Sequence, residues 1–245
     1  MATAGGALRA GTVAALYRYP VKSTAGQLLR IAPVMTDRFQ HDRQWAAYTA
    51  DGGIASGKRT RRFRPVPGLM QWQSTAHDGD DVPYLISPAG QRFRVDDPVA
   101  SSALSAAFDQ PLTLRAETTI QHYDESPVHV VTTSSLAAAQ TLIGVPLDRR
   151  RVRSNIIIDT GVEPWFLEDE WAGGLLAIGP EVLLRLGPAM TRCVMIDQDQ
   201  RGVAARPHAL KPLGMHHDAR LGVQASVLRA GNIQLRDPVT WLLDA

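Results

Sequence analysis

The sequence predicts a mainly β protein with a few helices, of the α+β class. Most of its apolar residues fall in short runs rich in Val, Ile, Leu and Tyr that are broken by Gly, Pro and Asp, a spacing that favours strands. Turn-forming residues separate several of these runs, as at Asp51-Gly52 and from Pro88 to Gly90. With 245 residues, of which 44% are hydrophobic, the chain can bury a core as one large domain or two small ones.

The first hundred residues contain consecutive strand-like stretches and predict a small β-barrel or sandwich. These stretches are 11–23, 44–53, 68–87 and 88–98. A boundary is predicted around residues 110–125. It divides the chain into an N-terminal small β-barrel-like domain at 10–115 and a second domain at 120–245.

A first helix is predicted over 96–110. Asp97 can cap this helix, and Pro98 suits its first position because the missing N–H has no partner there in any case. Its apolar residues fall roughly on one helical face, which consists of Val99, Ala103, Ala107 and Phe108.

The second half is again predicted to be mainly β, with one helix near its start. This helix follows the strand-like stretch 127–131, begins near Ser134 and ends at Gly144, a suitable C-terminal cap. Further strands are predicted at NIIID (155–159), GLLAIG (174–179), EVLLRLG (181–187), CVMID (193–197), VQASVL (223–228) and NIQLRD (232–237).

The cysteine content and the charge exclude several classes of protein. The single cysteine, Cys193, cannot form an internal disulfide, hold an iron–sulfur cluster or complete a four-cysteine zinc site. Twenty-six Lys and Arg residues against 24 Asp and Glu give a net charge of +2, which is not the basic balance of a general nucleic-acid-binding protein. No signal peptide or membrane-spanning stretch is recognisable, so we expect a cytoplasmic protein that binds neither nucleic acid nor membrane.

Several polar clusters stand at the ends of apolar runs, and each has two interpretations. Lys22 and Ser23 close the first strand, where a lysine is either solvated or a phosphate contact. Arg43 is either a surface ion-pair residue or a pocket residue whose fork of donors suits a phosphate or a polar heterocycle. Arg153 and Asn155 share one face of a predicted strand, and this face is either a binding surface or simply exposed to solvent.

Thr132, Thr133 and Ser134 lie where a predicted strand runs into a predicted helix. The free N–H groups of a helix N-terminus bind anions, but Ser and Thr are also ordinary helix caps. The acidic residues at 168–170 indicate either a paired-carboxylate site or, more simply, a solvated turn.

Cys193 directly follows Arg192 and precedes a short apolar run. A lone thiol is a small buried hydrophobe, a nucleophile or a metal ligand. The adjacent cation favours the thiolate, but neighbouring side chains of a strand point to opposite faces, so this effect requires an irregular backbone at this point. Taken by itself, the sequence Thr191-Arg192-Cys193 leaves the three interpretations of the thiol open.

Together and in this order, the motifs resemble the MOSC family, named for the C-terminal domain of molybdenum cofactor sulfurases, preceded by the family's N-terminal β-barrel. The resemblance covers nearly the whole chain. Its motifs are YPVKS, HDRQW, SPVHVVTTSSL, RVRSNIII, EDEWAGGLLAIG, TRCVMIDQD and LRDPVTWLL. The chain differs from the family at Thr191, where Ser is frequent, at Ser154, where Pro is frequent, and near Gln224, where amidoxime-reducing relatives tend to have an aromatic residue.

The resemblance implies a fold in which 120–245 forms a MOSC β-barrel domain. It also implies binding of the molybdenum cofactor (Mo-molybdopterin), a pterin dithiolene with a terminal phosphate. Cys193 would be the protein ligand to molybdenum and the catalytic residue. The residues that would hold the pterin and the phosphate are Lys22, Ser23, Arg43, Thr132, Thr133, Ser134, Arg153, Asn155, Thr191 and Arg192.

The chain resembles the amidoxime-reducing branch, which implies reduction of a small N-hydroxylated substrate. One cysteine cannot hold an iron–sulfur cluster, and no flavin or nicotinamide loop is visible. Electrons would therefore come from a separate redox protein of the ferredoxin, flavoprotein or cytochrome type. Two alternatives stay open: a sulfur carrier in cofactor maturation through a Cys193 persulfide, and a non-catalytic cofactor carrier.

Overall fold

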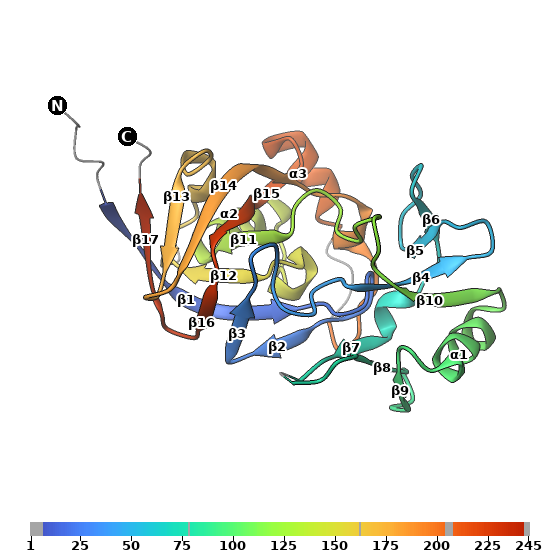
Figure 1. The fold of residues 1–245 in the computed structure, drawn as a ribbon. Coiled ribbons are helices and arrows are strands. Elements are labelled where there is room, and N and C mark those ends of the chain that lie inside the picture. Colours follow the sequence, from blue (N-terminus) through green and yellow to red (C-terminus); the bar gives the residue numbers. More distant parts are fainter. Residues whose placement is uncertain (1–6, 78, 162, 204–207, 243–245) are drawn as a thin grey trace.

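A closed barrel of seven strands forms the end of the protein that carries the two termini (Figure 1). The computed structural model describes residues 7–77, 79–161, 163–203 and 208–242. Around the barrel the strands follow the order β1 (Ala7–Arg18), β12 (Ile156–Asp159), β11 (Val128–Thr132), β15 (Arg220–Arg229), β14 (Val182–Thr191), β13 (Leu175–Ile178) and β17 (Pro238–Leu242). β17 and β12 both pair with β1, which closes the ring.

β1 closes the barrel because it bends. Its pairing register shifts between Val13 and Ala15 against β12, and between Arg9 and Gly11 against β17. At Gly11 the backbone of β1 comes so close to β12 that an added Cβ would lie 2.1 Å from the carbonyl oxygen of Asp159. Glycine is therefore required at this crossing of two backbones.

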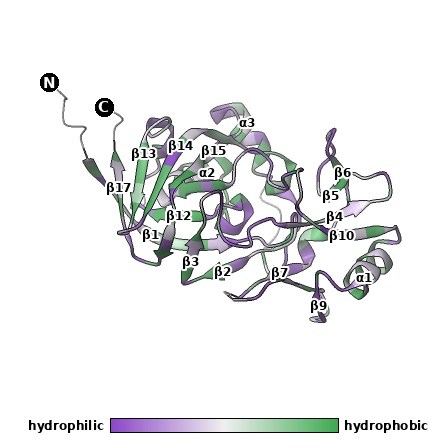
Figure 2. Ribbon diagram, in the orientation of Figure 1, coloured by the Kyte–Doolittle hydropathy of each residue, from purple (hydrophilic) through white to green (hydrophobic). Residues whose placement is uncertain are grey.

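The barrel strands β11 and β12 are buried on both faces. In β12, Ile156 and Ile158 belong to the core cluster that also holds Val13 and Leu16, whereas Ile157 belongs to a second cluster. The second cluster packs the outside of the barrel against α2 (Thr133–Ile143) and α3 (Leu210–His217). Burial on both faces explains why the parallel pair β11 and β12 is mostly apolar, and β12 is accordingly green in Figure 2.

A smaller unit lies beside the barrel, at the end of the molecule opposite the two termini (Figure 1). It has its own core cluster, which includes Val21, Trp72, Leu85 and Leu104. One of its sheets has four strands, β10 (Leu112–Ala116), β4 (Trp45–Thr49), β5 (Ile54–Ser56) and β6 (Phe63–Pro65). The other has three, β7 (Gln73–Thr75), β8 (Tyr84–Ile86) and β9 (Arg92–Arg94), and α1 (Pro98–Phe108) precedes β10.

The remaining strands link these parts. β2 (Gln27–Leu29) pairs with β1, and β3 (Ile31–Val34) pairs with β16 (Gly231–Gln234). The mainly β, α+β fold class is confirmed. The predicted division into 10–115 and 120–245 stays a prediction; β1, from the first range, takes its place among barrel strands from the second.

The turns and caps are confirmed at the predicted positions. Asp51 and Gly52 turn the chain between β4 and β5, and the carboxylate of Asp97 accepts the N–H of Val99 at the start of α1. The predicted apolar face of α1 is only partly correct, since Ala103 and Phe108 pack against the core. Ala100 and Leu104 are buried, whereas Val99 and Ala107 are exposed.

The predicted second helix is confirmed as α2, which ends at Gly144 in the left-handed conformation. The predicted strand at 193–197 is wrong. There the chain forms a 3-10 turn, η4 (Val194–Asp197), with Cys193 at its N-terminal boundary. The Asp197 carboxylate accepts the N–H groups of Ala209 and Leu210 at 2.6 and 3.2 Å, which ties this turn to the start of α3.

Within the described residues, none of the helices is long and apolar enough to cross a membrane.

Candidate functional site

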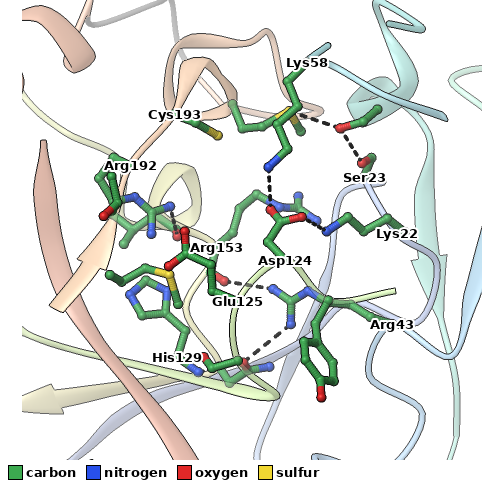
Figure 3. Close-up of a pocket in the computed structure, with 18 residues that line it drawn as sticks. Lys22, Ser23, Arg43, Lys58, Asp124, Glu125, His129, Arg153, Arg192 and Cys193 are labelled. Atoms are coloured by element: carbon green, nitrogen blue, oxygen red, sulfur yellow. Dashed lines mark hydrogen bonds and ion pairs between the residues drawn. The ribbon is translucent and has the colours of Figure 1, made fainter. Parts of the chain in front are cut away.

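A polar pocket lies where the barrel meets the smaller unit (Figure 3). Its empty volume is about 850 Å³, part of which is open to solvent, and this size is in the range of small-molecule binding sites. The structure brings eight of the predicted site residues together in its lining: Lys22, Ser23, Arg43, Arg153, Asn155, Thr191, Arg192 and Cys193.

Three of these residues have an unusual backbone conformation. Ser23, Arg43 and Arg153 lie in the left-handed region, with φ of 64°, 53° and 55°. Residues other than glycine rarely adopt this conformation, and such strain collects at functional sites. Arg153 does so because it ends the 3-10 turn η2 (Arg149–Val152) before β12 begins, so it is not part of the strand on which it was predicted.

The end of β14 directs Arg192 and Cys193 into the same pocket. β14 ends at Thr191, and the backbone of Arg192 leaves the ladder to donate its N–H to the carbonyl of Ala219 at 2.6 Å. Cys193 is half-buried and precedes the turn η4. In a continuous strand, the side chains of Arg192 and Cys193 would point to opposite faces. The strand ends here, so both side chains can line the same pocket.

Buried cations make the pocket a site for an anion. Burial lowers the pKa of Lys22 to about 8, against the opposing effect of Asp124. Burial also lowers the pKa of Arg153 to about 10 and lowers that of Arg192. These shifts show that the charges present in the pocket do not neutralise the cations fully.

Arg192 supplies the clearest sign of a missing partner. Its Nη2 donates to the carbonyl of Val152 at 2.6 Å, but its buried Nε has no hydrogen-bond partner among the residues that the structure describes. Buried donors are rarely left unpaired, so an acceptor brought by a ligand fits this position.

Arg43 links neighbouring segments of the pocket wall through its guanidinium group. Its Nη1 is paired with Asp42, and its Nη2 donates to the carbonyl of Arg153 at 3.2 Å. Burial by itself would lower the pKa of Arg43, but Asp42 outweighs this and keeps the pKa above its usual value. The guanidinium also lies over the ring of Tyr19, 4.8 Å from its centre, as does that of Arg153 at 4.4 Å.

Sequence reasoning missed the lysine, the two acids and the histidine that also line the pocket: Lys58, Asp124, Glu125 and His129. Asp124 lies between two lysines, 2.6 Å from Nζ of Lys22 and 2.9 Å from Nζ of Lys58 (Figure 3). Burial would raise the pKa of Asp124, but the two ammonium groups outweigh it and hold the pKa well below its usual value. A signal was present, because the adjacent acids Asp124 and Glu125 lie only one residue before the predicted strand at 127–131.

His129 is buried in the wall of the pocket. Its Nε2 lies 3.2 Å from the carbonyl oxygen of Leu221, which can only accept, so this nitrogen carries a proton. Burial and the charge of Arg192 lower the pKa of His129 well below its usual value. We therefore describe the ring as neutral.

Thr132, Thr133 and Ser134 do not line the pocket, although they were predicted as cofactor contacts. Thr132 lies three residues beyond His129 on β11, a distance of about 10 Å along a strand. Its hydroxyl caps α2 by accepting the N–H of Ser135 at 3.1 Å. The physical reason is that the chain fills this helix N-terminus with the buried carboxylate of Glu168.

Glu168 accepts the N–H of Thr132 and the hydroxyl of Ser135. Thr133 and Ser134 are also engaged, since Thr133 donates to the carbonyl of Gly161 at 2.5 Å and the hydroxyl of Ser134 accepts from Thr160 at 2.9 Å. These contacts pair the start of α2 with a carboxylate from the chain itself, so this part of the helix has a structural role.

The pocket cannot hold a metal by protein ligands alone. Among the described residues, no three His, Cys, Asp or Glu side chains are grouped so that they could bind one. A single soft thiol surrounded by cations fits a metal that brings most of its ligands with it in an anionic cofactor. The residues present therefore fit the cofactor that the motifs implied.

Comparison with known proteins agrees with this fold. The YUAD protein from Bacillus subtilis has a structure that matches 99% of this chain and 100% of its own, with 10% identity and a TM-score of 0.55, which supports a shared fold. YiiM from Geobacillus stearothermophilus matches 48% of this chain and 54% of its own at 16% identity and a TM-score of 0.35. No curated protein gives a significant match. Since the MOSC domain model matches residues 117–240, half of the sequence, the chain belongs to the MOSC domain family.

Proposed function

We propose that the pocket binds the molybdenum cofactor and that the chain reduces small N-hydroxylated substrates with electrons from a separate redox protein. The observation that carries this proposal is the position of Cys193, whose half-buried thiol lines the same pocket as five cationic side chains. Members of the MOSC family are often molybdenum-cofactor-related enzymes, which supports the same cofactor here.

The cationic side chains would hold the anionic part of the cofactor. Lys22, Arg153 and Arg192 are the candidates, since each has a pKa lowered by burial that a bound anion would restore. Ser23 and Thr191 supply hydroxyl groups. The thiolate of Cys193 would bind molybdenum.

Asn155 has a different part in this proposal, because its amide is already used by the backbone. Its Oδ1 accepts the N–H of His129 at 3.1 Å, and its Nδ2 donates to the carbonyl of Tyr17 at 3.2 Å. It would therefore fix the start of β11 and the end of β1 relative to each other, and so position the residues that touch the cofactor.

The reaction consumes two electrons and two protons: the N–O bond of an N-hydroxy group is cleaved, an N–H bond forms and water leaves. When bound, the cofactor supplies a metal that changes oxidation state by two and takes up the oxygen atom. The protein holds the cofactor, leaves an opening for the substrate and receives the electrons from outside.

The test is elemental and pterin analysis of protein made in a host that synthesises the cofactor, followed by turnover of an amidoxime with a reduced dye as donor. We expect about one molybdenum per chain, bound pterin and turnover that the Cys193→Ser variant loses. Absence of molybdenum, or full activity in Cys193→Ser, would overturn the proposal. Sulfur on Cys193 without pterin would indicate the persulfide carrier, and bound cofactor without turnover would indicate the carrier protein.

A further inference from the structure

The connection between β5 and β6 carries an unusual density of positive charge. Residues 57–64 have the sequence GKRTRRFR, in which five of eight residues are Lys or Arg. We call this segment the basic loop. It belongs to the end of the smaller unit that lies furthest from the chain termini (Figure 1).

Two arginines of the basic loop have no side-chain partner within the described ranges. Arg64 pairs with Asp51 at 2.6 Å, and Arg62 donates to the carbonyl of Gln121. Arg59 and Arg61, by contrast, are exposed, and no side-chain hydrogen bond or ion pair ties them to the residues that the structure describes. Their charge is therefore available to another molecule.

The loop is held in place, which suits a docking surface. Phe63 is buried at its end and has three cations around its ring, Lys22 at 5.0 Å, Lys58 at 4.7 Å and Arg62 at 5.3 Å from the ring centre. The hydroxyl of Thr60 accepts the N–H groups of Arg62 and Phe63, each at 3.1 Å. A preformed surface loses little conformational entropy when a partner binds.

The base of the loop touches the turn that follows Cys193. An added Cβ on Gly57 would lie 2.9 Å from the sulfur of Met195, and Lys58 lines the pocket itself (Figure 3). Next to Cys193, the apolar side chain of Val194 is 42% exposed. An apolar contact beside a charged rim is the usual composition of a protein interface.

We infer that the basic loop and Val194 form the docking surface for an acidic electron-donor protein, which delivers electrons to the pocket that contains Cys193. The inference rests on the proposed function. The adjacency to the pocket favours a redox protein over a nucleic acid, as does the net charge of only +2, because general nucleic-acid-binding proteins are strongly basic. Opposite charges would speed the encounter and orient the donor over the pocket.

The test is amidoxime reduction by the cofactor-loaded protein with three purified acidic donors, a ferredoxin, a flavodoxin and a soluble cytochrome b5, each reduced by its own reductase. The variant is Arg59→Glu/Arg61→Glu, which changes two exposed residues outside the pocket. Arg9→Glu/Arg30→Glu is the matched control, because these exposed arginines lie on β1 and after β2 and give the same change in net charge. A small reduced dye, which needs no docking surface, measures the activity of the pocket itself.

At low salt we expect at least one donor to support turnover and the loop variant to slow it about tenfold, with little effect of added salt on the remaining rate. The control variant and the conservative Arg59→Lys/Arg61→Lys should keep the wild-type rate, and the dye-driven rate should be the same in all proteins. Dye-driven turnover with no response to any donor, or donor-driven rates that the loop variant leaves unchanged, would overturn the inference. Absence of dye-driven turnover in the wild type would instead overturn the proposed function.

Discussion

Replacing Asp124 with Asn should increase the affinity of the cofactor-free pocket for a small anion. The Asp124 carboxylate lies 2.6 Å from Nζ of Lys22 and 2.9 Å from Nζ of Lys58 and so competes with any anion for the same two ammonium groups. Asparagine keeps the size of the side chain and removes its charge. The change therefore tests whether Asp124 acts as the internal counter-ion of the pocket.

The size of the effect follows from the geometry. An anion that binds the same ammonium nitrogen at a similar distance lies within about 5.5 Å of the carboxylate oxygen, where two unit charges repel by about 3 kcal/mol at an effective dielectric constant of about 20. The side chain of Asp124 is 37% exposed, so solvent screens part of this repulsion. Half of the value, about 1.5 kcal/mol, corresponds to a Kd about ten times lower.

Sulfate is a suitable probe, because its charge does not change over the relevant pH range, and isothermal titration calorimetry measures its Kd. The titration is made near pH 6, since loss of Asp124 also removes an interaction that raises the pKa of Lys22. Asp218→Asn is the control, as Asp218 pairs with Arg220 away from the pocket and the net charge changes equally. An Asp124→Asn protein that binds sulfate no better than this control would refute the reasoning.

The pH dependence of sulfate binding should follow Lys22, whose pKa is lowered to about 8. The ammonium charge is present below that pH and lost above it, so wild-type affinity should fall as the pH rises through about 8 in calorimetry, and Lys22→Met should remove most of this dependence. Glu168→Ala leaves buried donors at the start of α2 without an acceptor and should lower the free energy of unfolding in urea by about 2–4 kcal/mol, with a smaller loss for Glu168→Gln. Gly11→Ala places a Cβ against the backbone of β12 and should cost about 3 kcal/mol in the same experiment, whereas Gly214→Ala, in open space on α3, should not destabilise the protein.

Features set by neighbouring residues were predictable from the sequence. Asp97 and Pro98 start α1 because a capping carboxylate and a fixed φ act within one turn of helix. Gly144 ends α2 for the same local reason. The apolar strands β11 and β12 were recognisable because burial on both faces leaves few polar residues within them.

Features set by distant residues were not predictable. The stretch after Cys193 has the composition of a strand, but Asp197 binds backbone N–H groups 12 and 13 residues further along and turns the chain instead. The start of α2 has the composition of an anion site, but Glu168 reaches it from 36 residues away. In both cases a carboxylate that no local pattern connects to its target decides the structure.

The site itself was predictable in part. The family motifs, rather than spacing or periodicity, identified eight residues that the structure gathers in one pocket. Lys58 and Asp124 belong to no quoted motif of that resemblance, and their ion pair forms between segments 66 residues apart. Such an ion pair can be found only when the fold has brought the two segments side by side.

The pocket combines features that each reduce the stability of the free protein. Ser23, Arg43 and Arg153 have left-handed backbones, and strain of this kind costs on the order of 1 kcal/mol or more for each residue. Within the described part of the chain, the buried Nε of Arg192 has no acceptor, and the lowered pKa of Lys22 indicates that its charge is incompletely neutralised. A bound anion would relieve the electrostatic costs but not the backbone strain, because strain depends on the local chain and not on charge. The two costs therefore have different roles. The backbone strain holds the side chains toward the pocket whether or not a ligand is bound. The unpaired charge makes an anion the ligand that the pocket favours.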